Sequence, residues 1–274
     1  VIVVTGGGTG LGKSMALRFA ELGARLVIAS RRREVIEAAV AEVEERGAQG
    51  LAVPCDVRDP AAVDALVARA VERFGRIDAL VNNAAGNFLC PTEELSPGGF
   101  DAVVRIVLHG TFHCTRAVGR QMIAQGDGGS ILSITTTYAT TGSAYVVPSA
   151  CAKAGVRALT KSLAVEWARH GIRCNAIAPG PFPTEGAWSR LVPEGLEEVL
   201  SPERIPAGRF GEHRELADLA SFLLSDGAAY ITGQEVTIDG GESLMAGEFN
   251  GLTRMDPARL AAVLRAMRPP KKQA

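Results

Sequence analysis

Seven short apolar runs, most of them rich in β-branched residues, alternate along this chain with segments that have the period of an amphipathic helix. One helical segment, between positions 63 and 74, places apolar side chains at i, i+3 and i+4 spacing, and a longer one runs from 148 to 169. This alternation predicts an α/β fold, a single doubly wound parallel sheet (Rossmann-like) with helices on both faces. The expected strands are residues 1–4, 26–29, 51–53, 79–81, 130–134, 172–177 and 235–238.

The length of 274 residues allows one large domain or two small ones, and the spread of the runs favours a single domain over residues 1–274. Prolines and glycines cluster at 179–211, where we expect a substrate-side insertion, and a C-terminal extension follows position 241. The 29 basic and 30 acidic residues nearly balance, which argues against a nucleic-acid partner. No apolar run approaches the roughly 18 residues of a membrane span. Five scattered cysteines without C-x-x-C spacing give no reason to expect a metal site.

A glycine-rich segment, residues 5–14, follows the first expected strand and begins the first helix. Glycines let the chain turn tightly and approach a phosphate, and the helix N-terminus offers free N–H groups to it. Residues 7–14 match the phosphate loop G-x-x-x-x-G-K-[ST] of nucleoside triphosphatases. Asp56 is then a candidate Mg²⁺ ligand, although Pro54 suits a central strand poorly. The same segment, with glycines at 6, 10 and 12, also matches T-G-x-x-x-G-x-G, a dinucleotide-binding turn.

Three consecutive arginines, residues 31–33, follow the second expected strand. A site that prefers NAD usually carries an acidic residue about 20 residues after the turn, where it bonds the ribose hydroxyls. Arginines suit a 2′-phosphate instead, and basic residues near a helix N-terminus are unfavourable unless an anion is present. The sequence therefore predicts NADP(H) as the cofactor of a dinucleotide site, with Arg31 at the phosphate.

Four motifs together resemble the short-chain dehydrogenase/reductase family and span nearly the whole chain. They are the turn at 5–12, the segment 82–86, Asn175 followed by Pro179 and Gly180, and the closing segment 239–241. This resemblance outweighs the triphosphatase interpretation, and it implies that Asp56 contacts the adenine amino group. It implies that the cofactor is held by Thr5, Gly6, Gly8, Thr9, Gly10, Leu11, Gly12, Arg31, Asp56, Asn83, Lys153, Pro179 and Gly180.

The family's usual catalytic pair, Y-x-x-x-K, is altered in this chain. Lys153 stands at the lysine position, but Ser149 replaces the tyrosine, and Thr136 stands where the family carries serine. Tyr138 lies nearby, after the fifth expected strand. This displaced tyrosine is similar to that of one branch of the family, the mitochondrial-type NADPH-dependent 2,4-dienoyl-CoA reductases. Five short segments also resemble that branch: residues 85–88, 146–149, 179–181, 189–191 and 247–250.

The likeness to this branch implies reduction of a 2,4-dienoyl-CoA to a 3-enoyl-CoA with NADPH, in the β-oxidation of unsaturated fatty acids. It implies a homotetramer, in the cytoplasm of a bacterium or in the mitochondrial matrix of a eukaryote. His109 stands where the branch commonly carries asparagine, and we expect its side chain near the active-site floor. The implied catalytic residues are Tyr138, Lys153 and Ser149, and the implied acyl-CoA contacts are Asn87, Phe88, Ser96 and Arg190.

The expected chemistry needs a hydrogen-bond donor at the thioester oxygen, where negative charge develops, and Tyr138 can supply it. Ser149 and Lys153 are four residues apart and share one helix face. The Lys153 charge would favour a more acidic tyrosine hydroxyl, and by resemblance its ammonium bonds the nicotinamide ribose. Three alternatives stay open: another short-chain reductase acting on a 3-oxoacyl or enoyl thioester, a non-enzymatic NADP-binding sensor, and a phosphate-loop triphosphatase.

Overall fold

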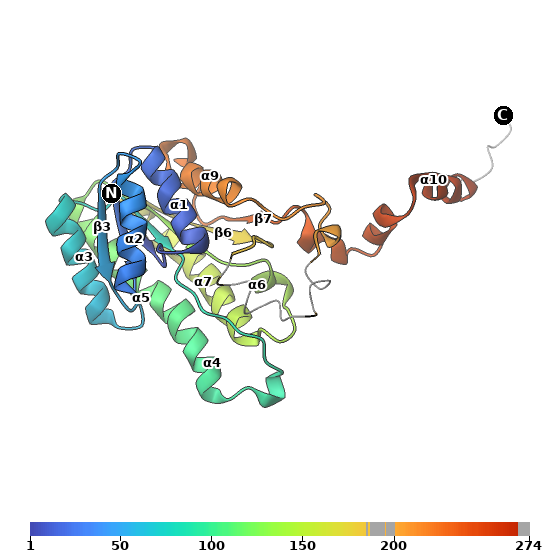
Figure 1. Cartoon of the computed structure of the whole chain (residues 1–274), viewed down its shortest axis with the longest axis horizontal. Helices are drawn as coiled ribbons and strands as arrows, with labels where there is room; N and C mark the ends of the chain where they lie inside the picture. The colour runs from blue at the N-terminus through green and yellow to red at the C-terminus, as the bar shows by residue number, and fades with distance from the viewer. Residues whose placement is uncertain (185, 187–194, 196–200, 268–274) are drawn as a thin grey trace.

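The computed structural model describes residues 1–184, 186, 195 and 201–267 and places seven strands in one parallel sheet (Figure 1). The order of the strands in the sheet is β3-β2-β1-β4-β5-β6-β7. The doubly wound parallel sheet expected from the sequence is therefore confirmed. Its strands are β1 (Ile2–Thr5), β2 (Leu26–Ser30), β3 (Gly50–Pro54), β4 (Ala79–Asn82), β5 (Gly129–Ile134), β6 (Ile172–Pro179) and β7 (Glu235–Ile238).

Helices cover both faces of this sheet. Adjacent strand residues point to opposite faces, so Val3 joins the core beneath α3, α5 and α7, while Val4 joins the core beneath α1, α2 and α9. The α-helices are α1 (Gly10–Glu21), α2 (Arg33–Glu44), α3 (Pro60–Phe74), α4 (Pro97–Val104), α5 (Gly110–Gln125), α6 (Tyr138–Thr141), α7 (Val147–Glu166), α9 (His213–Leu224) and α10 (Pro257–Ala266). The short helical turns are η1 (Thr92–Glu94), the π-helical η2 (Arg105–His109), η3 (Ala168–His170), η5 (Pro202–Arg204), η6 (Asp226–Ala228), η7 (Glu242–Ala246) and η8 (Asn250–Arg254).

The two helices expected from the sequence, α3 and α7, are both found, and local interactions explain how they are bounded. The Asp59 carboxylate accepts a hydrogen bond from the Ala61 N–H at the start of α3, and Gly75 ends that helix with a φ of 79°. The helix expected at 148–169 is α7, which ends earlier, at Glu166. The chain there tightens into η3 and turns through Gly171, with a φ of 70°, into β6.

Every strand is parallel, so the carboxyl ends of the strands lie along one edge of the sheet. The chain leaves β1 toward β2 on one side and later returns to place β4 on the other side. Open α/β sheets bind ligands in the crevice at such a reversal. The segments after β1, β4, β5 and β6 all leave this edge, and they carry most of the residues that the sequence nominated.

Two features of the periphery differ from the interior of the sheet. Pro54 is the last residue of the edge strand β3, where a missing N–H is tolerated. After position 241 the chain leaves the sheet through η7 and η8, and α10 projects away from the body (Figure 1).

The insertion expected at 179–211 lies partly outside the described residues. Within the described part of the chain, no helix has both the length and the apolar character needed to cross a membrane.

Candidate active site

The glycine-rich turn packs directly on the segment that follows β4. Thr5 Oγ1 accepts a hydrogen bond from the Asn83 N–H at 3.0 Å, and Asn83 Nδ2 donates to the carbonyl oxygens of Thr5 and Gly6 at 3.1 Å each. Gly6 and Gly10 have φ angles of 64° and 53°, which glycine adopts without strain. A β-carbon at Gly12 would lie 2.4 Å from both the Gly6 carbonyl oxygen and Asn83 Nδ2. The turn therefore requires glycine for its shape and leaves a cradle at the start of α1.

The first turn of α1 presents backbone N–H groups to this cradle. Thr9 is the N-cap residue, and its side chain forms no capping hydrogen bond, so those N–H groups can serve a phosphate. Lys13 does not serve it, because its Nζ forms an ion pair with Glu42 of α2 at 2.5 Å. A phosphate loop of the triphosphatase type needs that lysine on the nucleotide. The cradle thus fits a dinucleotide and not the alternative triphosphatase site.

Arg31 follows β2 at the same edge and is exposed. Its guanidinium makes no hydrogen bond or ion pair with other described residues.

Asp56 follows β3, and its carboxylate accepts hydrogen bonds from the Arg58 guanidinium at 2.9 and 2.5 Å. Those bonds, together with the charges of Arg58 and Arg31, hold the pKa of Asp56 below its usual value. The contact of Asp56 with an adenine amino group stays a prediction.

Tyr138, which follows β5, contacts Ser149, the residue that stands at the family's usual tyrosine position on α7. Tyr138 is the first residue of the single-turn helix α6, and its hydroxyl lies 3.1 Å from Ser149 Oγ of α7. The same hydroxyl accepts a hydrogen bond from Asn87 Nδ2 at 3.2 Å. The Ser149 side chain is almost fully buried at 2% exposure, so its hydroxyl has a fixed position. Three segments of the chain thereby hold one phenolic oxygen at the carboxyl edge of the sheet.

Lys153 lies one turn further along α7 and is buried at 7% exposure. Its ammonium donates a hydrogen bond to the Ile134 carbonyl, the last of β5. Burial disfavours the charged form and lowers the pKa of Lys153 to about 8. A buried ammonium at the carboxyl end of β5 is suited to bonding cofactor hydroxyls and to stabilising negative charge on a nearby oxygen.

Comparison with known proteins supports the assignment that this geometry suggests. Residues 6–243 match the family model described as Enoyl-(Acyl carrier protein) reductase. The chain is 46% identical over 244 residues to a probable 2,4-dienoyl-CoA reductase, (2E)-enoyl-CoA-producing, of Bacillus subtilis (strain 168), covering 89% of this chain and 96% of that protein. It is 43% identical to the probable 2,4-dienoyl-CoA reductase 3, (3E)-enoyl-CoA-producing, of Caenorhabditis elegans, covering 88% and 80%.

A crystal structure of a short chain dehydrogenase from Bacillus anthracis superposes with a TM-score of 0.81 at 46% identity, covering 88% of this chain and 95% of that one. This chain belongs to the short-chain dehydrogenase/reductase family. It is therefore an oxidoreductase with the family's nicotinamide-dinucleotide site, and the resemblance read from its motifs is confirmed.

The remaining predicted cofactor positions, Pro179 and Gly180, lie where β6 ends. Pro179 is the last residue of β6, and the Gly180 N–H donates to the Ile238 carbonyl at 2.9 Å. A β-carbon at Gly180 would lie 2.5 Å from that of Asp239. Asn175 acts within the fold, because its buried amide bonds the Ile231 carbonyl and the Gln234 N–H.

The nominated substrate residues that the structure describes, Asn87, Phe88 and Ser96, lie in the segment that follows β4. The Asn87 Oδ1 atom accepts a hydrogen bond from the Phe88 N–H at 2.9 Å, and Phe88 is 36% exposed. Ser96 has a local role, because its hydroxyl caps α4 by accepting from the Gly99 N–H at 3.1 Å. Arg190 lies outside the described residues. Their contacts with an acyl-CoA remain predictions.

The position of the His109 side chain near the active-site floor stays a prediction. His109 is exposed at the end of η2 and lines a cavity of about 320 Å³ with Arg58 and Arg105. Val107, two residues earlier, is the buried side chain that packs against α7. The π-helical geometry of η2 shifts the turn register by about one residue, and this shift is not evident from the sequence.

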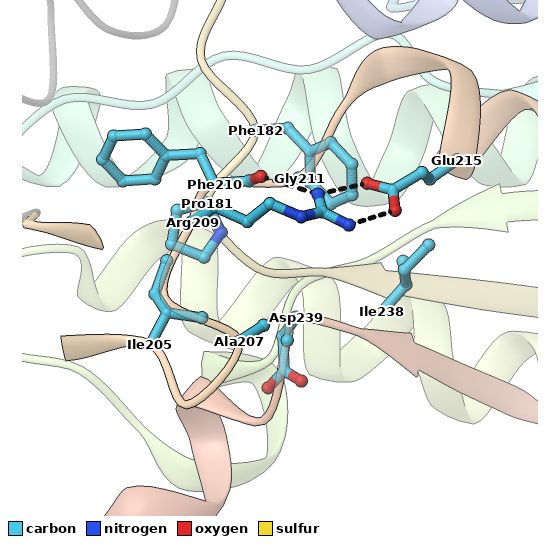
Figure 2. A pocket seen from close by; sticks show the side chains of 11 residues that line it. Pro181, Phe182, Ile205, Ala207, Arg209, Phe210, Gly211, Glu215, Ile238 and Asp239 are labelled. Atoms are coloured by element: carbon cyan, nitrogen blue, oxygen red, sulfur yellow. Dashed lines mark hydrogen bonds and ion pairs between the residues drawn. The ribbon is translucent and has the colours of Figure 1, made fainter. Parts of the chain in front are cut away.

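A smaller pocket of about 80 Å³ lies beside the ends of β6 and β7, and Figure 2 shows the side chains that line it. Arg209 spans it and forms a two-point ion pair with Glu215 of α9, at 2.9 and 2.6 Å. Those bonds lower the pKa of Glu215 to about 2. The Phe182 ring lies against Gly211, where a β-carbon would approach it to 2.4 Å. These contacts attach the segment after 201 to the sheet, and the sequence motifs gave no sign of them.

Proposed function

We propose that this protein reduces a 2,4-dienoyl-CoA thioester to a 3-enoyl-CoA with NADPH. One observation carries the proposal: Ser149 and Asn87 hold the Tyr138 hydroxyl, the buried Lys153 lies one helical turn from Ser149, and Ser149 stands where the family usually carries tyrosine. A donor displaced from α7 to α6 is aimed differently from that of a ketone reductase. It suits a substrate whose reacting carbon lies several bonds from the polarised oxygen.

The residues of the site have separable roles in this reaction. NADPH, when bound, supplies a hydride to C5 of the conjugated chain. Negative charge then develops on the thioester oxygen, and the Tyr138 hydroxyl donates a hydrogen bond to it. Asn87 donates to the phenolic oxygen and orients its proton. The Lys153 ammonium bonds the ribose and, by its charge, makes the nearby phenol a better donor.

The position of the final proton decides the product. Protonation of the dienolate at C2 leaves the double bond at C3, whereas protonation at C4 leaves it at C2. The printed names of the relatives divide on this point, since the Bacillus protein is called (2E)-enoyl-CoA-producing and the Caenorhabditis protein (3E)-enoyl-CoA-producing. We propose that water protonates C2. Tyr138, Ser149 and Lys153 are the described proton donors that we assign to the site, and their proposed roles are at the thioester oxygen, the phenol and the ribose.

The preference for NADPH over NADH rests on Arg31. Its guanidinium, which pairs with no other residue that the structure describes, follows β2 directly and suits the bidentate bonding that a phosphate offers. By the same proposal the protein acts in β-oxidation of unsaturated fatty acids, as a homotetramer of single-domain chains. Its compartment would be the bacterial cytoplasm or the mitochondrial matrix. Light scattering of the purified protein tests the tetramer.

The decisive experiment follows NADPH absorbance with a 2,4-dienoyl-CoA and, separately, with a 3-oxoacyl-CoA. We expect oxidation with the dienoyl substrate, and NMR of the product should place the double bond at C3. Turnover of the ketone alone would favour the alternative reductase, and NADPH binding without turnover of either would favour a sensor. A Tyr138→Phe variant should lose at least about 100-fold in kcat, as expected for a lost oxyanion donor. Full activity of this variant would refute the assigned role.

A further inference from the structure

The helix that carries Tyr138 has little to hold it in place by itself. α6 is a single turn and contains no buried residue, and its last two residues and the four that follow, 140–145, are exposed. An isolated turn is unstable in water because its few hydrogen bonds do not offset the cost of fixing the backbone. The position of the phenolic oxygen therefore depends on contacts made by other side chains of this segment.

One ion pair reaches this segment on both sides of Tyr138. On the C-terminal side, Arg157 of α7 donates from Nη1 to Thr140 Oγ1 at 2.9 Å. On the N-terminal side, Thr135 Oγ1 lies 2.7 Å from Oε1 of Glu235, the first residue of β7. Arg157 and Glu235 also meet each other, with 2.9 Å between Nε and Oε2.

The direction of each hydrogen bond in this chain of contacts is defined. The Thr135 hydroxyl lies 2.7 Å from Glu235 Oε1 and 3.0 Å from the Ile177 carbonyl oxygen, which also accepts the Thr135 N–H. The carboxylate is both closer and charged, so it is the stronger acceptor for the single hydroxyl proton. The Arg157 Nε group lacks hydrogen-bond geometry toward Oε2, so that contact is electrostatic. Glu235 is only 9% exposed at its side chain, and the attraction is therefore weakly screened.

We propose that Arg157 and Glu235 are positioning residues for Tyr138. Their ion pair fixes Thr135 before the tyrosine and Thr140 after it, and so sets where the phenolic oxygen meets the thioester. This inference rests on the proposed function for its catalytic readout. It concerns side chains that lie on α7 and β7 and that none of the family motifs described above include.

The first test replaces Arg157 by Met, which keeps the length of the side chain and removes its charge. We expect kcat with 2,4-dienoyl-CoA and NADPH to fall about tenfold or more, because misplacement of a catalytic group by about 1 Å can cost up to about 100-fold. The KM for NADPH should change less than about twofold. The matched control is Arg76→Met, which removes an arginine–carboxylate pair with Asp78 at the opposite edge of the sheet. It should leave kcat unchanged.

A double variant separates positioning from stability. Arg157→Met alone leaves the Glu235 charge buried without its partner, and this destabilises the fold. Adding Glu235→Gln removes that charge, so the urea midpoint should recover toward wild type. Thr140 still lacks its partner, so kcat should stay low. Recovery of kcat together with stability would overturn the proposal, because the arginine would then be merely structural.

A third readout does not depend on the reaction. Hydrogen exchange of the peptide spanning residues 135–146 should become at least about tenfold faster in Arg157→Met and not in Arg76→Met. Unchanged exchange would overturn the positioning role whatever the substrate is. Absence of dienoyl-CoA turnover by the wild-type protein, with the exchange difference present, would instead refute the proposed function alone. In a Tyr138→Phe background, Arg157→Met should lower kcat by less than about twofold; a full tenfold further loss would contradict action through the tyrosine.

Discussion

Replacing the buried Lys153 by Met tests how strongly the fold disfavours this charge. Burial lowers the pKa of Lys153 from its ordinary 10.5 to about 8. At about 1.36 kcal/mol per pKa unit, this difference corresponds to about 3 kcal/mol of folding free energy. The cost is fully present below pH 8, where lysine is charged in both the folded and the unfolded chain. It disappears as the pH rises toward 10.5, because the folded state loses its proton first.

The expected result is a difference between two stability profiles. From pH 7 to pH 10 the unfolding free energy of the wild type should rise by about 2 kcal/mol relative to Lys153→Met, since most of the cost is gone by pH 10. All other titrating groups are shared by the two proteins and cancel in the comparison. At any one pH the variant also loses the bond to the Ile134 carbonyl, so the informative quantity is the change with pH and not the offset.

Urea denaturation at several pH values from 7 to 10, without cofactor, measures this change. Lys161→Met is the matched control, because Lys161 lies exposed on the same helix and its removal should not alter the profile. Profiles of wild type and Lys153→Met that run parallel within about 0.5 kcal/mol would refute the reasoning. They would mean that water or a rearranged partner reaches the ammonium and that its burial carries no electrostatic cost.

Three further outcomes are expected. Gly12→Ala should weaken NADPH binding at least about tenfold and destabilise the fold by about 1–3 kcal/mol through overpacking. Fluorescence titration measures the binding and urea unfolding measures the stability. The control Gly98→Ala places its methyl group in open space and should change neither quantity. Arg31→Ala should raise the KM for NADPH at least about tenfold and leave that for NADH nearly unchanged; equal effects on both would contradict the phosphate contact. The kcat/KM of the wild type should fall above about pH 8, as the Lys153 ammonium titrates, and Lys153→Arg should abolish that decline in whatever activity it retains.

Lys13 shows how a matching motif can mislead about a single side chain. The segment 5–14 contains both nucleotide-binding patterns, the dinucleotide turn at 5–12 and the phosphate loop at 7–14. The difference lies in the direction of one ammonium, which points to Glu42 on a neighbouring helix. Ser96 was nominated for the acyl-CoA, yet its hydroxyl is engaged in capping α4. For Lys13, a contact with a residue outside the motif decides what the side chain does. Ser96 can still donate its hydroxyl proton, and its contact with an acyl-CoA stays a prediction.

The sequence by itself determined the elements that depend on neighbours in the chain. Apolar runs and helical periodicity predicted all seven strands, and the glycine pattern predicted the turn between β1 and α1. Both signals are local, since side-chain alternation and backbone freedom act over a few residues. The nomination of Tyr138 also came from the sequence, through its resemblance to one branch of the family.

Only the tertiary structure decided which distant residues meet. The contact of Asn87 with Tyr138, the outward position of His109 beyond a π-helical turn, and the pairing of Arg157 with Glu235 join segments that follow different strands. Such contacts depend on the order of strands in the sheet and on the exact rotation of each helix. Neither leaves a periodic trace in the sequence, because many residue types are compatible with the same exposed or half-buried position.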